Sequence, residues 1–402
     1  MSQTAEKKAE LGGAGLRGQS AGSTALCTVG KTGTGLTYRG YDITDLANNA
    51  QFEEVAHLLL RGHLPNQQEL DAYKTHLLSL RGLPAELKQA LELIPASAHP
   101  MDVMRTGCSV LGNLEQEMSF EEQLKATERM LALFPAIICY WYRFSHDGVR
   151  INTEDQTEDC IGGYFLRLLT DKAPSALHKQ VMHCSLILYA EHEFNASTFA
   201  ARVCASTLSD IHSCITAAIG TLRGPLHGGA NEAAMEMIED WQTPDEAEAN
   251  IMKMLANKDK IMGFGHAIYR ESDPRNALIK RWSKELSKQV GDTHLYAVSE
   301  RVESVMKREK GLFCNADFFH ASAYHFMDIP TKLFTPIFVM SRLTGWAAHV
   351  YEQRANNRII RPSADYTGPD HQEWVPIENR WREGQREHYM LWLTTSFLRH
   401  SL

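Results

Sequence analysis

The sequence predicts an all-α fold for this chain of 402 residues. Apolar residues recur at helical spacing from about residue 41 to residue 354, and prolines and glycines divide this region into segments of helix length. Strand-like alternation is nearly absent. With 44% hydrophobic and 22% charged residues, the composition is that of a globular protein with a large core.

Charge and cysteine content restrict the class of protein. The net charge of −8 argues against nucleic-acid or anionic-membrane partners, although local basic sites could bind an anionic metabolite. The longest uncharged apolar run, residues 130–142, is shorter than the roughly 20 residues of a membrane helix. The N-terminus carries no apolar secretory signal. The eight cysteines include no Cys-x-x-Cys pair, so we expect reduced core residues in a cytoplasmic protein.

The N-terminal region has two alternative interpretations. Residues 1–22 are polar and glycine-rich, which predicts a mobile tail. Residues 25–32 resemble a relaxed phosphate-binding loop, a function that requires a helix to begin at Lys31. Two glycines follow within four residues and would break such a helix. We therefore interpret residues 26–38 as a small β-hairpin.

Helical segments follow in order. Asn195 or Ser197 can cap one helix whose apolar face extends over residues 199–219. Beyond Pro362 the periodicity is lost until residues 387–402, which could form a terminal helix. The other predicted helical segments are 52–60, 68–80, 99–105 (a helix start), 121–142, 231–240, 245–257, 274–290, 294–307 and 330–354.

Two histidines and one acid occupy irregular backbone between these helices. His227 lies between a proline and a Gly-Gly pair, and His266 follows Gly-Phe-Gly. Asp317 lies in the apolar stretch 312–320, where desolvation would raise its basicity. Neutral imidazole can donate a hydrogen bond to a carbonyl. The three side chains are therefore suited to proton transfer on a small molecule.

Each of these residues also has a plainer interpretation. A single histidine among apolar residues is more often structural, and Asp317 could simply cap the helix that follows it. Metal binding by His192, His227 or His266 is not supported, because no second histidine returns at a ligand spacing. Repeated placement in glycine-flanked turns favours a functional role for His227 and His266.

Basic residues predict an anionic ligand. Arg275, Arg342 and Arg361 carry planar guanidinium groups that can bind a small dicarboxylate bidentately, although any one of them could be a surface residue. The Asn-Lys-Asp-Lys segment at 257–260 adds cationic groups ahead of His266, or is only a charged helix end.

Several long motifs occur in one order along the chain. They are residues 36–43 (Leu-Thr-Tyr-Arg-Gly-Tyr-Asp-Ile), 99–106 (His-Pro-Met-Asp-Val-Met-Arg-Thr), 191–198 (Glu-His-Glu-Phe-Asn-Ala-Ser-Thr), 224–231 (Gly-Pro-Leu-His-Gly-Gly-Ala-Asn), 263–266 (Gly-Phe-Gly-His) and 360–362 (Ile-Arg-Pro). From about residue 25 to 376, the sequence resembles the citrate synthase family, and most closely its 2-methylcitrate synthase branch.

The resemblance implies a Claisen-type condensation of an acyl-CoA thioester with oxaloacetate. Asp317 would remove a proton from the α-carbon of the thioester, while His227 donates a hydrogen bond to the thioester oxygen. His266 would polarise the ketone of oxaloacetate, and hydrolysis would then release CoA. No metal or redox cofactor is implied.

The resemblance also assigns the binding residues. Oxaloacetate would be held by His192, Arg275 and Arg342, with Arg361 supplied by the partner subunit of a homodimer. The segment that contacts CoA would comprise Asn257, Lys258, Asp259, Lys260 and Ile261. A large helical domain (23–222 and 328–378) would carry a small domain (223–327) that closes over the substrates. Residues 379–402 have no counterpart in the family.

The acyl group is the least determined feature. Propionyl-CoA and acetyl-CoA differ by one methylene, worth about 1 to 3 kcal/mol in a pocket, so we expect activity with both and a preference for propionyl-CoA. Tyr189, Phe318 and Phe319 could shape the acyl pocket or could be ordinary core residues. The alternatives are a citrate synthase of the central cycle using acetyl-CoA, an inactive helical scaffold, and a nucleotide-binding protein that uses residues 30–32.

Overall fold

The computed structural model describes residues 15–16, 18–30, 35–377 and 380. By internal contacts the chain divides into a first unit, residues 1–360, and a second unit, residues 361–402. Most of the predicted tail, residues 31–34 and nearly all of the predicted C-terminal extension with its terminal helix lie outside the described residues.

A small antiparallel sheet begins the first unit and confirms the predicted hairpin. Strand β1 (Cys27–Val29) pairs with β2 (Leu36–Tyr38), which pairs with β3 (Tyr41–Asp42). Alternate residues of β1 and β2 are buried, as a two-residue period requires. The Tyr38 hydroxyl donates to the Ile187 carbonyl at 2.8 Å, so the sheet is tied to the helical core close to the residues that precede His192.

Helices make up almost all remaining regular structure of the described residues, which confirms the all-α prediction. The first half contains α2 (Ile43–Asn49), α3 (Phe52–Arg61), α4 (Gln67–Ser79), α5 (Ala85–Glu92), α6 (Pro100–Leu114), η1 (Phe120–Glu122), α7 (Gln123–Asp147), α8 (Ile161–Thr170) and α9 (Ala176–Tyr189). The start predicted at His99 is confirmed, because its side chain accepts from the Met101 amide while Pro100 occupies the first turn. Helix α7 continues through Pro135.

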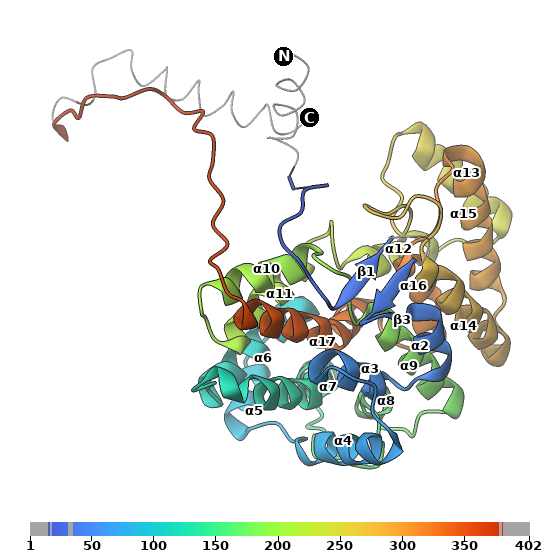
Figure 1. Cartoon of the computed structure of the whole chain (residues 1–402). Helices are drawn as coiled ribbons and strands as arrows, with labels where there is room; N and C mark the ends of the chain where they lie inside the picture. Colours follow the sequence, from blue (N-terminus) through green and yellow to red (C-terminus); the bar gives the residue numbers. More distant parts are fainter. Residues whose placement is uncertain (1–14, 17, 31–34, 378–379, 381–402) are drawn as a thin grey trace. The chain divides into compact units, whose positions relative to one another are not determined.

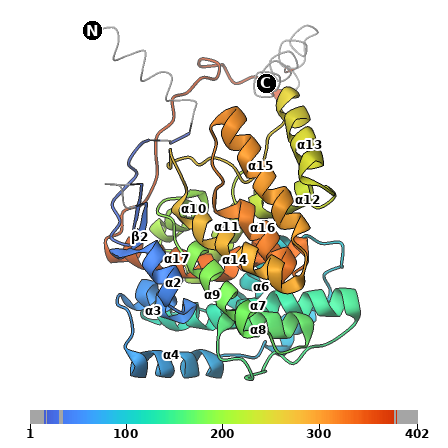
Figure 2. The same cartoon turned by 90° about the vertical axis from the view of Figure 1, so that its right-hand side faces the viewer.

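The second half holds the segments that carry most of the candidate site. They are α10 (Ala196–Ser206), α11 (Ile211–Leu222), α12 (Ala230–Ile238), α13 (Pro244–Ala256), α14 (Pro274–Val290), α15 (His294–Lys310), α16 (Ala316–Phe326), η2 (Thr331–Leu333) and α17 (Phe334–Ala355). Helices α13 and α15 lie side by side at one end of the first unit (Figures 1 and 2).

The single helix expected over residues 199–219 is wrong, because two helices occupy this region. Helix α10 begins after its cap Asn195 and ends at Ser206, and Leu208 then adopts a positive φ of 65°. Asp210 starts α11 by accepting a hydrogen bond from the Ser213 amide at 2.9 Å. The apolar face continues across the break, so periodicity alone did not reveal it.

Helix α17 forms the centre of the first unit. It packs against α3, α7, α9, α10 and α11, and its residues from Phe334 to Val350 are all buried. Gly345 permits the closest of these contacts, because a Cβ there would collide with the Ala190 carbonyl oxygen. The Ser341 hydroxyl also donates to the Leu186 carbonyl of α9. Helix α17 and the C-terminal end of α9 are therefore held in direct backbone contact.

The eight cysteines are free, and all but Cys204 are buried, as expected for reduced core residues. Within the described ranges, every helix is too short or too polar to cross a membrane. The predicted division into a large domain and a closing small domain stays a prediction.

Candidate active site

A short backbone pairing joins the His266 loop to the start of α16. The Gly265 amide donates to the Phe313 carbonyl at 2.8 Å, and the Asn315 amide donates to the Gly263 carbonyl at 2.9 Å. Gly263 and Gly265 have φ values of 87° and 73°, a region that favours glycine. The Gly-Phe-Gly spacing therefore permits the turn that places His266 beside the helix that carries Asp317.

The protonation of His266 follows from its backbone donors. Its Nδ1 atom accepts from the Ile268 and Tyr269 amides, at 3.0 and 3.3 Å, so in the neutral ring the proton lies on Nε2. Burial, reinforced by Arg275, lowers its pKa to about 4. Near neutral pH this imidazole is an uncharged hydrogen-bond donor.

His192 lies in the loop between α9 and α10, next to His266. The two rings are 5.0 Å apart, and His192 Nε2 is 3.0 Å from the Tyr269 hydroxyl. Burial first, and then the positive charge of Arg275, lowers the pKa of His192 well below its ordinary value. Tyr269 thus contacts both histidines: its hydroxyl reaches His192, and its backbone amide and ring contact His266, with the two rings 4.5 Å apart.

His227 is oriented by the first turn of α10. The Ser197 amide donates to its Nε2 at 3.2 Å, and the Ser197 hydroxyl is 2.8 Å from the same atom. The indole N–H of Trp346 in turn donates to that hydroxyl at 3.0 Å. Because Nε2 accepts, the proton of the neutral ring lies on Nδ1. Burial, followed by Arg342, lowers the pKa of His227 to about 3.

Asp317 lies in the first turn of α16 and does not cap it. Asn315 is the cap, and its side chain accepts from the Asp317 amide at 3.0 Å, so the capping alternative for Asp317 is wrong. The Tyr189 hydroxyl donates to Asp317 Oδ1 at 2.7 Å. Burial raises the pKa of Asp317 to about 6, although this hydrogen bond and Arg275 oppose the rise. The result is a carboxylate suited to accept a proton near neutral pH.

The arginines have different surroundings. Arg275, at the start of α14, forms two hydrogen bonds with Asp273, at 2.9 and 2.7 Å. Arg342 of α17 donates to the Tyr189 carbonyl at 2.5 Å, and burial lowers its pKa to about 10. Arg361 is exposed and is the first residue of the second unit.

The second unit has few internal interactions among its described residues. The Tyr366 hydroxyl donates to the Pro369 carbonyl at 2.8 Å, and the Arg380 guanidinium donates to the Val375 carbonyl at 2.8 Å. The role that the resemblance implies for Arg361, in the oxaloacetate site of a partner subunit, stays a prediction.

The predicted CoA segment directly follows α13. Asn257 is the C-cap of that helix, and Lys258 has a positive φ of 62°. Residues 257–260 are exposed, whereas Ile261 is buried. The alternative of a charged helix end therefore describes its local structure, and its contact with CoA stays a prediction.

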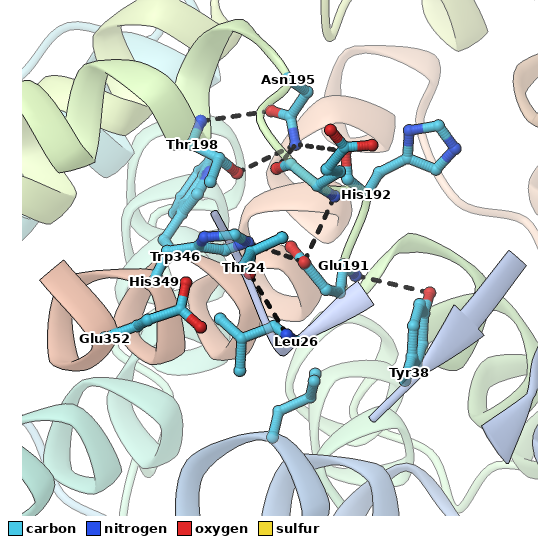
Figure 3. A network of polar contacts seen from close by, with 12 residues as sticks. Thr24, Leu26, Tyr38, Glu191, His192, Asn195, Thr198, Trp346, His349 and Glu352 are labelled. Carbon is cyan, nitrogen blue, oxygen red and sulfur yellow. Dashed lines mark hydrogen bonds and ion pairs between the residues drawn. The ribbon is translucent and has the colours of Figure 1, made fainter. Parts of the chain in front are cut away.

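Sequence reasoning missed a buried polar network behind the His192 loop (Figure 3). The Nε2 proton of His349 is donated to Glu191 at 2.7 Å, because the Nδ1 atom of His349 accepts from Arg202 at 2.9 Å. Glu191 and His349 are fully buried. In Figure 3 the Glu191 side chain points toward His349, whereas the His192 ring points away from that pair. The adjacent Glu-His in the sequence was the one available signal.

Asp273 was also missed. Its carboxylate caps α14 by accepting from the Arg275 amide at 3.0 Å, and it also accepts from the Ala316 amide at 3.0 Å in the first turn of α16. Burial acts to raise the pKa of Asp273, but the charge and the hydrogen bonds of Arg275 outweigh it and hold the pKa below its ordinary value. Asp273 thereby fixes Arg275 relative to the turn that carries Asp317.

Shared neighbours connect the candidate residues. The Phe338 ring is 4.2 Å from the ring of Tyr189 and 6.4 Å from that of His227, and it lies 4.7 Å from the Arg342 guanidinium. Together with the pairing of His192 and His266, these contacts join loops from distant parts of the sequence. The arrangement combines a base with neutral donors and cationic groups, as proton abstraction beside a carbonyl requires.

Comparisons with known proteins identify the family. The model of the citrate synthase C-terminal domain matches residues 15–363. A 2-methylcitrate synthase of Shewanella oneidensis is 69% identical over 371 residues, covering 92% of this chain and 99% of that protein. Citrate synthase 2 of Bacillus subtilis is 45% identical over 350 residues, covering 86% and 93%.

Solved structures agree with this relationship. The citrate synthase of Thermoplasma acidophilum, solved as a ternary complex, has a fold similar to that of this chain, with a TM-score of 0.85 at 31% identity, covering 91% of this chain and 99% of that chain. That structure contains carboxymethyl coenzyme A and oxaloacetate. By sequence and by fold, this chain belongs to the citrate synthase family.

Proposed function

We propose that the protein is a 2-methylcitrate synthase, which condenses propionyl-CoA with oxaloacetate and water to give 2-methylcitrate and CoA in propionate catabolism. The observation that carries this proposal is the 69% identity to the Shewanella oneidensis 2-methylcitrate synthase, over nearly the full length of both chains. Family membership supports the reaction type, and the local geometry supports the roles of Asp317, His227 and His266.

In the first step, Asp317 removes a proton from the α-carbon of propionyl-CoA. Its pKa of about 6, raised by burial, supports its use as a base near neutral pH. The Nδ1 proton of His227 is donated to the thioester oxygen as negative charge develops there. The His227 ring is neutral and is oriented by Ser197, which supports this role, because a donor that is already in place needs little reorganisation during the reaction.

In the second step, the enol carbon attacks the ketone of oxaloacetate. His266 donates its Nε2 proton to the ketone oxygen, while His192, Arg275 and Arg342 bind the keto-acid and its carboxylates. Water then adds to the thioester carbonyl of the condensed product, the C–S bond breaks, and CoA leaves as the thiol. These steps need no metal or redox cofactor.

The same proposal includes the assembly. Two chains form a homodimer in which Arg361 of each chain completes the oxaloacetate site of the other, and residues 257–261 contact CoA. The small domain, residues 223–327, closes over the substrates and excludes water from the enol. The eight free cysteines support a reducing cytoplasmic location.

A citrate synthase activity with acetyl-CoA is the second candidate. The 45% identity to the Bacillus subtilis citrate synthase 2 favours it, and one methylene gives only about 1 to 3 kcal/mol of discrimination. We therefore expect activity with both thioesters and a higher kcat/KM with propionyl-CoA.

The test is a thiol-release assay with oxaloacetate and each acyl-CoA in turn. A higher kcat/KM with acetyl-CoA would replace the methylcitrate assignment by the citrate assignment. The Asp317→Ala variant should release thiol about 100- to 10,000-fold more slowly, because it lacks the general base. Thiol release by this variant at the wild-type rate would contradict the mechanism, and a wild-type chain inactive with both thioesters would favour the inactive scaffold.

A further inference from the structure

A chain of hydrogen bonds ends on the candidate base. The side-chain amide of Asn231, on α12, donates to the Tyr189 hydroxyl at 3.4 Å, and that hydroxyl donates to Asp317 Oδ1 at 2.7 Å. Asn231 lies four residues after His227. The Tyr189 hydroxyl thus connects the helix that follows one candidate catalytic residue with the helix that carries another.

The ring of Tyr189 is held on both faces. It stacks on His320 at 4.2 Å with an interplanar angle of 30°, and on Phe338 at 4.2 Å with an angle of 24°. Only 1% of Tyr189 is exposed. Its carbonyl oxygen also accepts from Arg342. Ring and backbone are both restrained, so the direction in which the hydroxyl points is set by packing.

We propose that Tyr189 is the residue that positions Asp317 as the base. Its hydroxyl donates a hydrogen bond to Oδ1 of Asp317, which leaves Oδ2 free to take the α-proton of the acyl-CoA. This inference rests on the proposed function. A donor on one oxygen fixes the rotation of the carboxylate, so Oδ2 is presented to the substrate in one orientation. The same donor stabilises the ionised form of Asp317 relative to the protonated form.

The groups around the carboxylate determine in which direction loss of the Tyr189 hydroxyl changes the pKa of Asp317. Burial raises the pKa of Asp317 and the Tyr189 hydrogen bond lowers it, so loss of the hydroxyl should raise it further. The other titratable or charged groups near this carboxylate or near the Tyr189 ring are Arg275 and Asp273 at the start of α14, Arg342 on α17, and His320 and Tyr324 on α16.

This role differs from the pocket-shaping role that the sequence suggested for Tyr189. A residue that only shapes the acyl pocket would change the ratio of kcat/KM between propionyl-CoA and acetyl-CoA. A residue that positions the base acts on the carboxylate, whatever the size of the acyl group. Its loss should therefore lower kcat/KM equally for both thioesters. The two roles therefore predict different results for one substitution.

The test compares Tyr189→Phe with Tyr324→Phe. Tyr189→Phe keeps the stacked ring and removes only the hydroxyl. The control Tyr324→Phe also removes a buried hydroxyl, on α16 itself, that is hydrogen-bonded to Ser185 and not to Asp317. For each chain, kcat/KM would be measured against pH with both thioesters, and thermal unfolding would check the fold.

We expect the acidic limb of the Tyr189→Phe profile to move up by about one pH unit, and its plateau to fall roughly ten- to a hundredfold with both thioesters. The Tyr324→Phe profile should coincide with that of the wild type. An unmoved limb, or a loss confined to one thioester, would overturn the inference.

A second measurement does not depend on turnover. Aspartate labelled with ¹³C at its side-chain carboxyl would be titrated by NMR in the wild type and in Tyr189→Phe, with Asp317→Asn to assign the signal. A titration midpoint that rises in Tyr189→Phe supports the inference, and an unchanged midpoint contradicts it. If the wild type released no thiol with either thioester, the proposed function and the role of Oδ2 would fail together, while this titration would still decide whether the Tyr189 hydroxyl lowers the pKa of Asp317.

Discussion

Burial shifts the pKa of the acid and the pKa values of the imidazoles of this site in opposite directions. It lowers the pKa of His227 to about 3 and that of His266 to about 4, and it raises the pKa of Asp317 to about 6. In each case the charged form is disfavoured. At neutral pH both imidazoles are uncharged donors, and the carboxylate is ionised but basic. One physical cause thus produces both roles that the proposed condensation requires.

The same burial of charge predicts a gain in stability from Asp317→Asn. The folded-state pKa of about 6 exceeds the ordinary value of 3.8, so the charge of Asp317 reduces the stability of the folded state above about pH 6 and has no effect below about pH 4. After allowance for partial exposure, we expect Asp317→Asn to add about 1 to 2 kcal/mol to the free energy of unfolding at pH 7.5.

Denaturant unfolding at pH 7.5 and pH 4 would measure this gain, which should be lost at the lower pH. Asp240→Asn makes the same chemical change at an exposed position and should have little effect at either pH. Equal gains of Asp317→Asn at both pH values would show that the charge is not the cause.

At the scale of elements, the N-terminus of α16 organises one side of the site. Asn315 caps the helix through the Asp317 amide, and its side-chain amide donates to the Gly265 carbonyl at 3.1 Å. Asp273, the cap of α14, accepts from the Ala316 amide of α16 and pairs with Arg275. Loop and helix thus share their polar groups, which holds His266 close to Asp317 without a continuous element between them.

Asn315→Ala tests this arrangement. Loss of the cap should lower the free energy of unfolding by about 1 kcal/mol. Loss of the bond to Gly265 should also free the His266 loop and raise the KM for oxaloacetate about tenfold. Unfolding and steady-state kinetics would measure the two effects.

The matched control is Asn66→Ala, because Asn66 caps α4 through the Glu69 amide at 2.9 Å and has no contact with the candidate residues among its described hydrogen bonds. It should lose similar stability and keep the KM of the wild type. A KM for oxaloacetate that is equal in both variants would refute the positioning role of Asn315.

At the scale of the molecule, α17 is the element that supports the segment from the end of α9 to the start of α10. Arg342 contacts the last residue of α9, Trp346 orients Ser197, and His349 holds Glu191. These residues are spaced by about one turn, so they present one face to the α9–α10 loop. The close contact at Gly345 makes this packing possible.

The proposed homodimer predicts complementation between two inactive chains. If Arg361 acts in the partner's site, a dimer of one Asp317→Asn chain and one Arg361→Ala chain holds one intact site and one doubly defective site. Random pairing should therefore restore about a quarter of wild-type thiol release, since half of the dimers are mixed.

Co-expression of two differently tagged chains, purified over both tags, would isolate the mixed dimer, which has one intact site of two and should show about half of wild-type thiol release. If Arg361 acted within its own chain, both sites of the mixed dimer would be defective, and no activity would return.

Apolar periodicity, together with the prolines and glycines that divide it, was sufficient to predict the hairpin and most helices. The 3.6-residue spacing and the capping residues are local properties of the sequence. The motifs around His227, His266 and Asp317 were sufficient to recognise the family. Periodicity did not separate α10 from α11, because the apolar face continues across a short turn. The cap of α16 was misplaced because Asn315 and Asp317 are equally suitable by residue type.

Sequence alone therefore determined the fold class, the family and the candidate residues, because each depends on local pattern or on motif identity. Tertiary structure decided which ring nitrogen of each histidine carries the proton, and that Tyr189 donates to Asp317. It also revealed that Asp273 and Glu191 support the site. These features depend on donors brought from distant parts of the chain and on the water removed by packing, and neither can be read from neighbouring residues.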